Sequence, residues 1–518
     1  MSPLDPPGKN PRLFLCGLAV ALVLGGWLRL QGVLDLELTH WDEGPYVGWA
    51  LRVDPYLDRE PLAIYAPPLY PLVCRAVFAA FGRAPELAIC VSAVFGLLCV
   101  LLAGLLARQL FGDLTGAAAA LLLAFDPLHL TYSRMALTET AFTALLLLAL
   151  LLLGRALVSG RPPAAGFSGI CIGLAGTAKY HGFLPLIAGG LLLLIDPLWQ
   201  TRPGAVPAVS ADGPIDRFRK QLRVVVLAGL SALPFLLLLL WFIDRQMGLA
   251  AFLDTRGTWV MGFGLWAILA SLAGLCESVV RFGTPALLLL APLGLLLAAR
   301  ASRTQERLLF AALLILIVIL IWYRTYTRLY VPLVALSVPL AALALVRTAR
   351  RVAPGRPRAA ILVLTLLSIS TGVPSLVASQ RFRSDSYPRM ARLLEEQLER
   401  EPGAVILVAQ QALYPYLAPS AARRTFTITE PEARRRLSTG QYRYLLTDRR
   451  MERHELVRPY LPGLAGRLEE LFSIENPLPR PILYDRLGAA DYRAYLRQPK
   501  APEFAAERRL TLFHLTPR

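Results

Sequence analysis

Residues 85–107 read PELAICVSAVFGLLCVLLAGLLA, in which Glu86 is the only charged side chain. A helical stretch of about 20 apolar residues matches the thickness of the hydrocarbon core of a bilayer. Apolar runs of this kind lie at about 12–31, 85–107, 115–132, 140–158, 167–182, 183–198, 224–243, 284–299, 308–322, 330–346 and 359–377. The sequence therefore predicts a polytopic α-helical membrane protein with about 11 transmembrane helices. The shorter runs require broken helices or snorkelling side chains at their ends.

The composition of the 518-residue chain agrees with this class. Hydrophobic residues make up 55% and charged residues 17%, and the mean hydropathy is +0.51. These values exclude disordered, collagen-like and disulfide-scaffold proteins. The net charge is +18, which in a soluble protein would suggest a nucleic-acid partner. Basic residues are spread along the whole chain rather than gathered in one patch, so we expect no nucleic-acid partner.

Loop charges predict the orientation in the membrane. With a cytoplasmic N-terminus, the inner connections hold 18 Lys and Arg in roughly 76 residues, and the outer ones hold 11 in roughly 111. This asymmetry places the N-terminus inside and the region after the last span outside. The run at 12–31 is too long and lacks the small-residue cleavage site of a removable signal peptide, so we expect it to remain as an anchor.

Two apolar segments, 69–82 and 261–281, are interrupted by charged residues. We expect both to lie along the outer membrane surface with an apolar face in the interface. The first outer loop then runs from about 32 to 84, and long loops of this kind are usually functional. The predicted transmembrane domain covers residues 1–377.

After residue 377 the pattern changes to short apolar runs that alternate with helical stretches. The expected strands are Ala404–Ala409, Thr425–Thr429 and Tyr444–Thr447, and the expected helices are Arg389–Arg400, Glu430–Leu437 and Glu452–Leu461. Such alternation predicts a small soluble α/β domain at 378–518, on the periplasmic or extracellular side. Neither a Gly-rich phosphate loop nor a nucleophile motif occurs there.

Four polar groups fall on the outer face under this topology. They are 39–46 (with His40, Asp42, Glu43 and Tyr46), 126–139 (with Arg134 and Glu139), 177–182 (with Lys179 and His181) and 323–332 (with Arg328). Each has a simpler explanation: a solvated turn, a mutual Arg134–Glu139 ion pair, a snorkelling lysine, and an interfacial aromatic belt. The predicted topology rests on the loop charges alone and is independent of these four groups. Their shared face therefore favours one pocket for an anionic lipid head group, with a carboxylate base beside it.

These residues carry a resemblance that covers about residues 12–377. The order of elements is similar to the GT-C class of polyprenyl-phosphate-sugar glycosyltransferases, which includes the protein O-mannosyltransferases and the lipid A aminoarabinose transferases. The resemblance rests on Asp42-Glu43 with Tyr46, Ala66-Pro67-Pro68-Leu69-Tyr70, Pro127 through Arg134 to Glu139, Ala178-Lys179, and Arg328-Leu329-Tyr330-Val331-Pro332.

The resemblance implies a role for each matching residue. Asp42 would activate the acceptor hydroxyl or amine, with Glu43 beside it, and Glu139 would orient Arg134 or the acceptor. Lys179 and Arg134 would hold the lipid-linked phosphate, which leaves as the sugar transfers with inversion. The pocket would also be lined by Tyr46, Tyr70, Arg328 and His181.

Two departures from the family pattern leave alternatives. Many relatives have a basic residue where this chain has Ala66, so phosphate binding passes to Arg52 or Arg59, or rests on Lys179 alone. A tyrosine and His181 replace the usual small turn after Lys179. We expect no cofactor; a divalent cation held by His40, Asp42 and another histidine is the less favoured alternative.

The sequence thus predicts a multi-pass glycosyltransferase of the bacterial inner membrane. It would transfer a sugar from a polyprenyl-phosphate donor to a lipid, glycan or protein acceptor on the outer face. A transporter or flippase of a lipid-linked glycan would use the same pocket without chemistry, although the chain shows no internal repeat. A third possibility is a catalytically inert scaffold whose C-terminal domain binds a partner.

Overall fold

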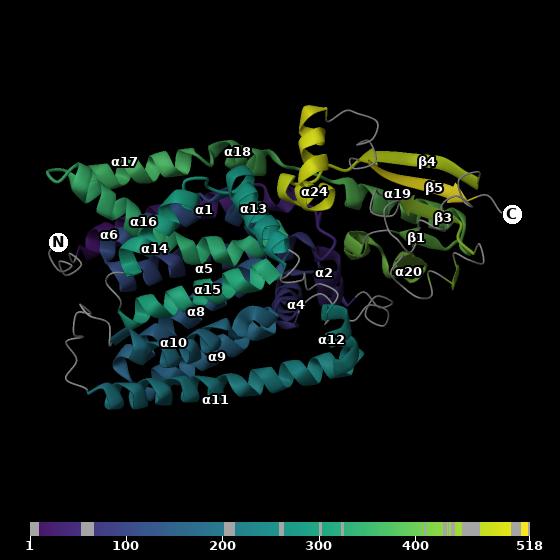
Figure 1. Cartoon of the computed structure of the whole chain (residues 1–518). Coiled ribbons are helices and arrows are strands. Elements are labelled where there is room, and N and C mark those ends of the chain that lie inside the picture. The colour runs from purple at the N-terminus through teal and green to yellow at the C-terminus, as the bar shows by residue number, and fades with distance from the viewer. Residues whose placement is uncertain are drawn as a thin grey trace.

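The chain folds into a long helical bundle with a small sheet at one end (Figure 1). The computed structural model describes residues 10–52, 67–200, 213–257, 264–299, 303–322, 326–408, 411–427, 433, 435–436, 441–447, 467–498 and 509–515. The main helices of the bundle are α1 (Pro11–Leu30), α5 (Glu86–Phe111), α6 (Asp113–Ala124), α7 (Pro127–Ser133), α8 (Thr138–Ser159), α9 (Pro162–Ala178), α10 (Leu184–Gln200), α11 (Pro214–Met247), α14 (Leu287–Ala299), α15 (Thr304–Trp322), α16 (Val331–Val352) and α17 (Pro357–Ser370). Shorter helices near the sheet end are α2 (Glu43–Leu51), α4 (Leu69–Phe81), α12 (Leu249–Gly257), α13 (Leu265–Phe282) and α18 (Val373–Arg381).

The polytopic helical class is confirmed, and every predicted apolar run coincides with helix. Within the described residues, 7 helices are long and apolar enough to cross a membrane, or up to 9 if two bent pairs are each one span. Of the predicted spans, those that contain α9, α10 and α14 are not counted, because these helices have 17 residues or fewer. Helix α13 is among the 7, although the sequence suggested a surface helix.

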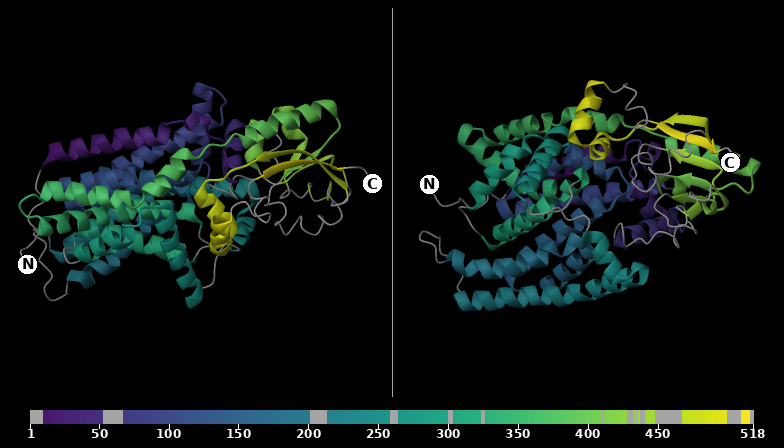
Figure 2. Two further views of the ribbon diagram at one scale, coloured as in Figure 1. Left: turned by 90° about the horizontal axis from the view of Figure 1, so that it is seen from above. Right: turned by 45° about the vertical axis from the view of Figure 1, so that its right-hand side comes forward.

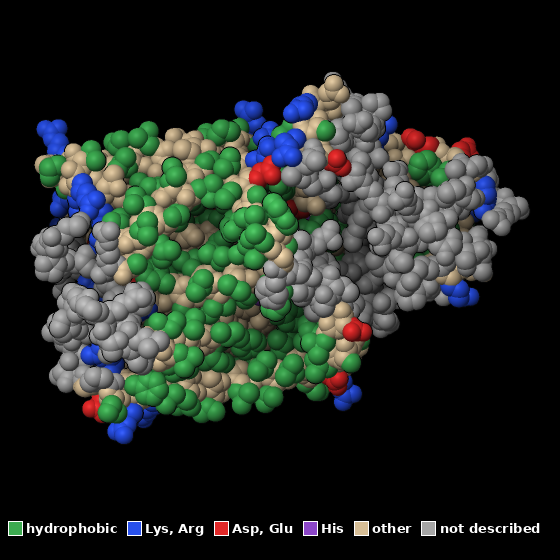
Figure 3. Space-filling view, in the orientation of Figure 1, with side chains coloured by type: hydrophobic (Ala, Val, Ile, Leu, Met, Phe, Trp, Pro, Cys, Tyr) green, Lys and Arg blue, Asp and Glu red, His purple; other side chains and the backbone are tan. Residues whose placement is uncertain are grey.

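The outside of the bundle is apolar, as a lipid-facing surface requires. Figure 3 shows hydrophobic side chains over most of the visible helices, with many Lys and Arg at the end opposite the sheet. Exposed examples are Leu237, Trp241, Trp266, Leu289 and Leu314. In water such a surface would drive association, so its extent supports a membrane environment.

Close helix packing depends on glycine at particular positions. A Cβ atom built on Gly294 in α14 would lie 1.9 Å from the carbonyl oxygen of Leu340 in α16. A Cβ on Gly169 in α9 would lie 2.2 Å from the carbonyl oxygen of Ala228 in α11. Small residues at such crossings let the two backbones approach closely. The van der Waals packing that results favours helix association in lipid.

We therefore expect Gly294→Ala to separate α14 from α16 and to lower the free energy of unfolding by about 2 kcal/mol. Thermal unfolding of the detergent-solubilised protein measures this. Gly190→Ala is the matched control, because a Cβ at that helical glycine meets nothing within 4 Å. Equal melting temperatures for the two variants would contradict the packing argument.

A buried arginine stabilises the bend between α6 and α7. Helices α6 and α7 meet at an angle of 61°. Arg29, fully buried in the last turn of α1, donates to the carbonyl oxygens of Leu123 (3.4 Å) and Ala124 (3.0 Å) at this bend. It also contacts His129 Nδ1 at 3.0 Å and Ser133 Oγ at 3.3 Å in α7. Carbonyl groups freed by a break in lipid need such partners.

The C-terminal region contains a five-stranded mixed sheet in the order β2-β1-β3-β5-β4. Its elements are α19 (Ser386–Arg400), β1 (Ile406–Val408), α20 (Pro419–Arg423), β2 (Thr425–Thr427), β3 (Tyr444–Thr447), β4 (Leu468–Glu475), α24 (Arg480–Arg497) and β5 (Arg509–Leu515). Strand β1 is parallel to β2 and β3, whereas β5 is antiparallel to β3 and β4. The α/β character is confirmed. The helix expected at Glu452–Leu461 and most of the one at Glu430–Leu437 lie outside the described residues.

Hydrogen bonds join the sheet region to the end of the bundle where α1 ends and α8 and α16 begin (Figure 2). Glu37 accepts from the Ser386 hydroxyl and the Tyr387 N–H, both at 2.7 Å, at the start of α19. The Tyr484 hydroxyl of α24 donates to Glu277 of α13 at 2.9 Å. The outer loop and the C-terminal region therefore share one interface.

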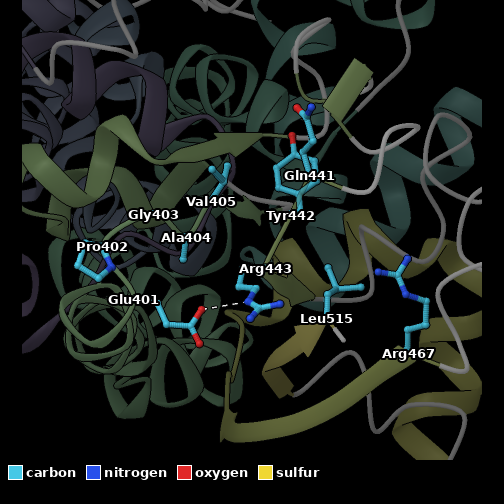
Figure 4. A pocket seen from close by; sticks show the side chains of 10 residues that line it. All are labelled: Glu401, Pro402, Gly403, Ala404, Val405, Gln441, Tyr442, Arg443, Arg467 and Leu515. Carbon is cyan, nitrogen blue, oxygen red and sulfur yellow. Dashed lines mark hydrogen bonds and ion pairs between the residues drawn. The ribbon is translucent and has the colours of Figure 1, made fainter. Parts of the chain in front are cut away.

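A cavity of about 360 Å³ lies within the sheet region (Figure 4). It is lined by residues just before β1 and β3, including Glu401 and Arg443, whose side chains form an ion pair of 3.1 Å. Parallel strands bind ligands at their carboxyl ends. This cavity lies at the amino ends, and Arg443, one of its two arginines, is already paired.

Candidate active site

The helix ends beneath the sheet region bring together polar residues from four parts of the chain. Asp42 precedes the first turn of α2, and Glu139 lies in the first turn of α8. Lys179 follows the last residue of α9, and Arg328 lies in the short helix η4 (Thr327–Tyr330) before α16. Each side chain sits at a helix end, where the chain leaves the apolar bundle.

These four residues, Asp42, Glu139, Lys179 and Arg328, form the charged cluster. Arg328 Nη1 forms an ion pair with Asp42 Oδ2, and its Nε lies 3.7 Å from Glu139 Oε1. The same Glu139 oxygen accepts from Lys179 Nζ at 2.7 Å. Two carboxylates thus balance two cations, with side-chain exposures between 1% and 15%. Burial of opposite charges is tolerated because each faces a partner.

Two carboxylate oxygens of the charged cluster remain available. Glu139 Oε2 is buried without a hydrogen-bond partner in the described part of the chain. Asp42 bonds through Oδ2 alone to the side chains that the structure describes. A buried carboxylate oxygen without a partner is costly, so it marks a place where an incoming donor would be stabilised.

Glu43 holds the turn that positions Asp42. Its carboxylate accepts backbone N–H groups of Thr39 (2.6 Å), His40 (2.7 Å) and Ala136 (2.5 Å). Burial raises the pKa of Glu43 to about 7, although these three donors oppose the shift. The Asp42 N–H in turn donates to His40 Nδ1 at 3.0 Å. Glu43 therefore lies beside Asp42, as expected, but is directed into the turn.

Arg134 does not join the charged cluster. Its Nη1 donates to the carbonyl oxygens of Leu28 (2.9 Å), Arg29 (3.2 Å) and Gln31 (2.8 Å) at the end of α1. Glu139 pairs with Lys179, so the described residues do not show the mutual Arg134–Glu139 ion pair that was the simpler explanation. Phosphate binding by Arg134 together with Lys179 stays a prediction. The carboxyl end of a helix attracts a cation, which explains the placement of Arg134.

Of the expected pocket-lining residues, Tyr46 and Tyr70 pack between helices, whereas His181 follows Lys179 closely in the chain. Tyr46 is buried in α2 and contacts the Tyr70 ring edge to face, with ring centres 6.2 Å apart. Tyr70 is fully buried, and its hydroxyl contacts the Ala88 carbonyl oxygen and Ser92 Oγ, both at 2.8 Å. Tyr70 thus fixes α4 against α5. His181 lies partly buried in η3 (Tyr180–Phe183), two residues after Lys179.

Sequence reasoning missed the residues that hold Arg328 in place. Thr327, its neighbour, donates its N–H (3.0 Å) and hydroxyl (2.6 Å) to Asp485 of α24. The Tyr132 hydroxyl contacts Thr327 Oγ1 at 2.5 Å from α7. Burial raises the pKa of Asp485 to about 7. Asp485 lies 158 residues from Thr327, and no spacing rule connects them.

The residues suggested for a metal ion do not form a centre in this structure. Among the described residues, no group of three His, Cys, Asp or Glu side chains could hold a metal ion. His40 Nδ1 accepts the Asp42 N–H, and Asp42 pairs with Arg328. Of the alternative phosphate ligands, Arg52 ends α2 and Arg59 lies outside the described residues, as does Ala66.

The sequence profile of the family described as dolichyl-phosphate-mannose-protein mannosyltransferase matches residues 65–207. This range includes Glu139 and Lys179 and covers less than half of the chain. A comparison with curated proteins finds no match.

Solved structures share the whole architecture. ArnT from Cupriavidus metallidurans bound to undecaprenyl phosphate is 14% identical, with a TM-score of 0.57 over 98% of this chain and 100% of that chain. AglB, an oligosaccharyltransferase from Archaeoglobus fulgidus in complex with an inhibitory peptide and a dolichol-phosphate, is 14% identical, with a TM-score of 0.57 over 89% and 73%. Both are GT-C glycosyltransferases, so the resemblance drawn from the sequence is confirmed. At these identities the likeness establishes the fold.

Proposed function

We propose that this protein is a membrane glycosyltransferase that transfers a sugar from a polyprenyl-phosphate donor to an acceptor, with inversion. The charged cluster is the observation that carries the proposal. It places two carboxylates and two cations at a single helix-end site in a GT-C fold, and the ArnT and AglB structures were solved with polyprenyl phosphates. The protein would lie in a bacterial inner membrane with its N-terminus in the cytoplasm.

Lys179 and Arg328 would bind the phosphate of the donor. Both point to Glu139 Oε1, so a phosphate oxygen entering between them would replace part of that carboxylate contact. When the glycosidic bond breaks, negative charge grows on the leaving phosphate, and preorganised cations lower the barrier by stabilising it. Glu139 keeps the two cations oriented before the donor binds.

Asp42 would act as the general base. Its Oδ1 would accept a proton from the acceptor hydroxyl or amine while Arg328 holds Oδ2. Attack from the face opposite the phosphate gives inversion at the anomeric carbon. Residues 378–518 would form an outer domain over this site, since α24 contacts η4 through Asp485.

We expect Lys179→Ala to weaken the binding of undecaprenyl phosphate about tenfold or more, because the phosphate would lose contact with a partly buried cation. Lys179→Arg should retain part of the affinity. Native mass spectrometry of the solubilised protein with added undecaprenyl phosphate measures this. Lys220→Ala, at the other end of the bundle in α11, is the matched control.

Unchanged binding in Lys179→Ala would refute the assignment of the phosphate site. The same preparation also separates enzyme from transporter. A transferase incubated with native lipid-linked sugars and membrane extract releases polyprenyl phosphate, whereas a flippase moves the lipid across vesicles without releasing it.

A further inference from the structure

A second cavity, of about 680 Å³, adjoins the segment that leads to Asp42. Its lining includes Thr39 of that turn, α7, α18 and the start of α24. None of the charged-cluster residues lines it. The Thr39 N–H donates to Glu43, so the cavity adjoins the turn that positions Asp42.

The cavity is lined by an excess of positive charge. Arg134, Arg381 and Arg480 line it, from the α7–α8 connection, α18 and α24. Its one acidic residue in the described lining, Glu37, already accepts two hydrogen bonds from Ser386 and Tyr387. Among the described residues, none of the three arginines forms an ion pair.

Arg134 carries the strongest sign of a missing anion. Its side chain is 95% buried, since the residue is 5% exposed, and Nη1 makes three bonds to carbonyl oxygens. Its Nη2 is buried and has no hydrogen-bond partner in the described part of the chain. A buried guanidinium group with an unused donor is costly unless an acceptor reaches it.

Much of the remaining lining is apolar and reaches the protein surface. Phe282, Leu478 and Leu483 line the interior, whereas Val377 and Leu496 are 38% and 46% exposed. Val377 belongs to α18, which continues the apolar helix α17. Arginines in the cavity beside exposed apolar side chains fit a molecule with an anionic head and a hydrocarbon tail.

We propose that this cavity binds an anionic phospholipid, separate from the site at the charged cluster. The phosphate would contact Arg134 Nη2 and the side chains of Arg381 and Arg480, bridging the helical bundle and α24. The acyl chains would leave past Val377 and Leu496 into the bilayer.

The test uses the full-length protein in detergent, titrated with phosphatidylglycerol and followed by native mass spectrometry. Arg381→Gln combined with Arg480→Gln avoids Arg134, which caps α1. We expect this double variant to bind phosphatidylglycerol about tenfold more weakly, because it loses two arginine–phosphate contacts. Arg389→Gln with Arg392→Gln is the matched control: both are exposed on α19, outside the cavity.

Four results would overturn the proposal, three of them from lipid binding alone. These three are equal binding of phosphatidylglycerol by the double variant and the wild type, equal loss in the control variant, and equal binding of phosphatidylcholine. Displacement of the lipid by inorganic phosphate at the same concentration would exclude a lipid as the ligand. Undecaprenyl phosphate binding that depends on Lys179 should persist in the double variant, which keeps this test independent of the proposed transferase activity.

Discussion

Replacing Asp42 by Asn is expected to reduce kcat for sugar transfer by about a thousandfold while the donor still binds. The amide is nearly isosteric with the carboxylate but cannot take the acceptor proton, and general bases contribute about 10²–10⁴ in rate. Arg328 loses its ion-pair partner yet retains Glu139 at 3.7 Å. Release of polyprenyl phosphate from native lipid-linked sugars measures the rate, and native mass spectrometry measures donor binding.

Asp35→Asn is the matched control for this variant. Asp35 is an exposed aspartate in η1 (Val33–Asp35), within the same outer loop, and is absent from the charged cluster. Its variant should transfer sugar at the wild-type rate. Undiminished transfer by Asp42→Asn would remove Asp42 as the base. A rate lost together with donor binding would instead indicate collapse of the site.

Replacing Arg29 by Leu is expected to lower the free energy of unfolding by about 3 kcal/mol or more. The change removes the bonds to Leu123, Ala124, Ser133 and His129. The Leu123 carbonyl oxygen keeps a long bond of 3.4 Å from the Asp126 N–H, and the Ala124 carbonyl oxygen loses the donor that the structure shows for it. Individual polar contacts in membrane proteins average about 0.6 kcal/mol, but unpaired buried groups cost about 1–3 kcal/mol each.

Chemical unfolding of the solubilised protein measures this loss. Arg12→Leu is the control, because Arg12 is exposed in the first turn of the same helix. Arg29→Lys should recover only part of the stability, since an ammonium group has fewer and less spread donors than a guanidinium group. If Arg29→Leu kept the wild-type stability, the bonds of Arg29 would not be needed to stabilise the bend between α6 and α7.

The fold could be predicted from the sequence because apolar length and loop charge depend on local composition. Strand β3 matches the predicted run Tyr444–Thr447, and α4 falls within residues 69–82. The number of spans was less predictable. Helices α10 and α14 are short, and the bends after α6 and α17 divide single runs into pairs.

The candidate site was only partly predictable, for a physical reason. Asp42, Glu139, Lys179 and Arg328 stand out because each is a charge beside an apolar run, where solvation is expensive. The sequence does not show which charges pair. Glu139 contacts Lys179, whereas Arg134, which is nearer to Glu139 in the sequence, donates to a carbonyl oxygen at the end of α1. Arg29 and Asp485 were missed because their roles depend on distant backbone groups.

The bond between Asp485 and Thr327 also has a consequence for biosynthesis. The ribosome makes α24 after every helix of the bundle, and α24 supplies the acceptor that fixes the segment bearing Arg328. A nascent chain can therefore insert all its membrane helices and still lack a fixed cation at the charged cluster. A segment synthesised after the membrane helices would then complete the charged cluster, which delays activity until α24 has been made and has folded.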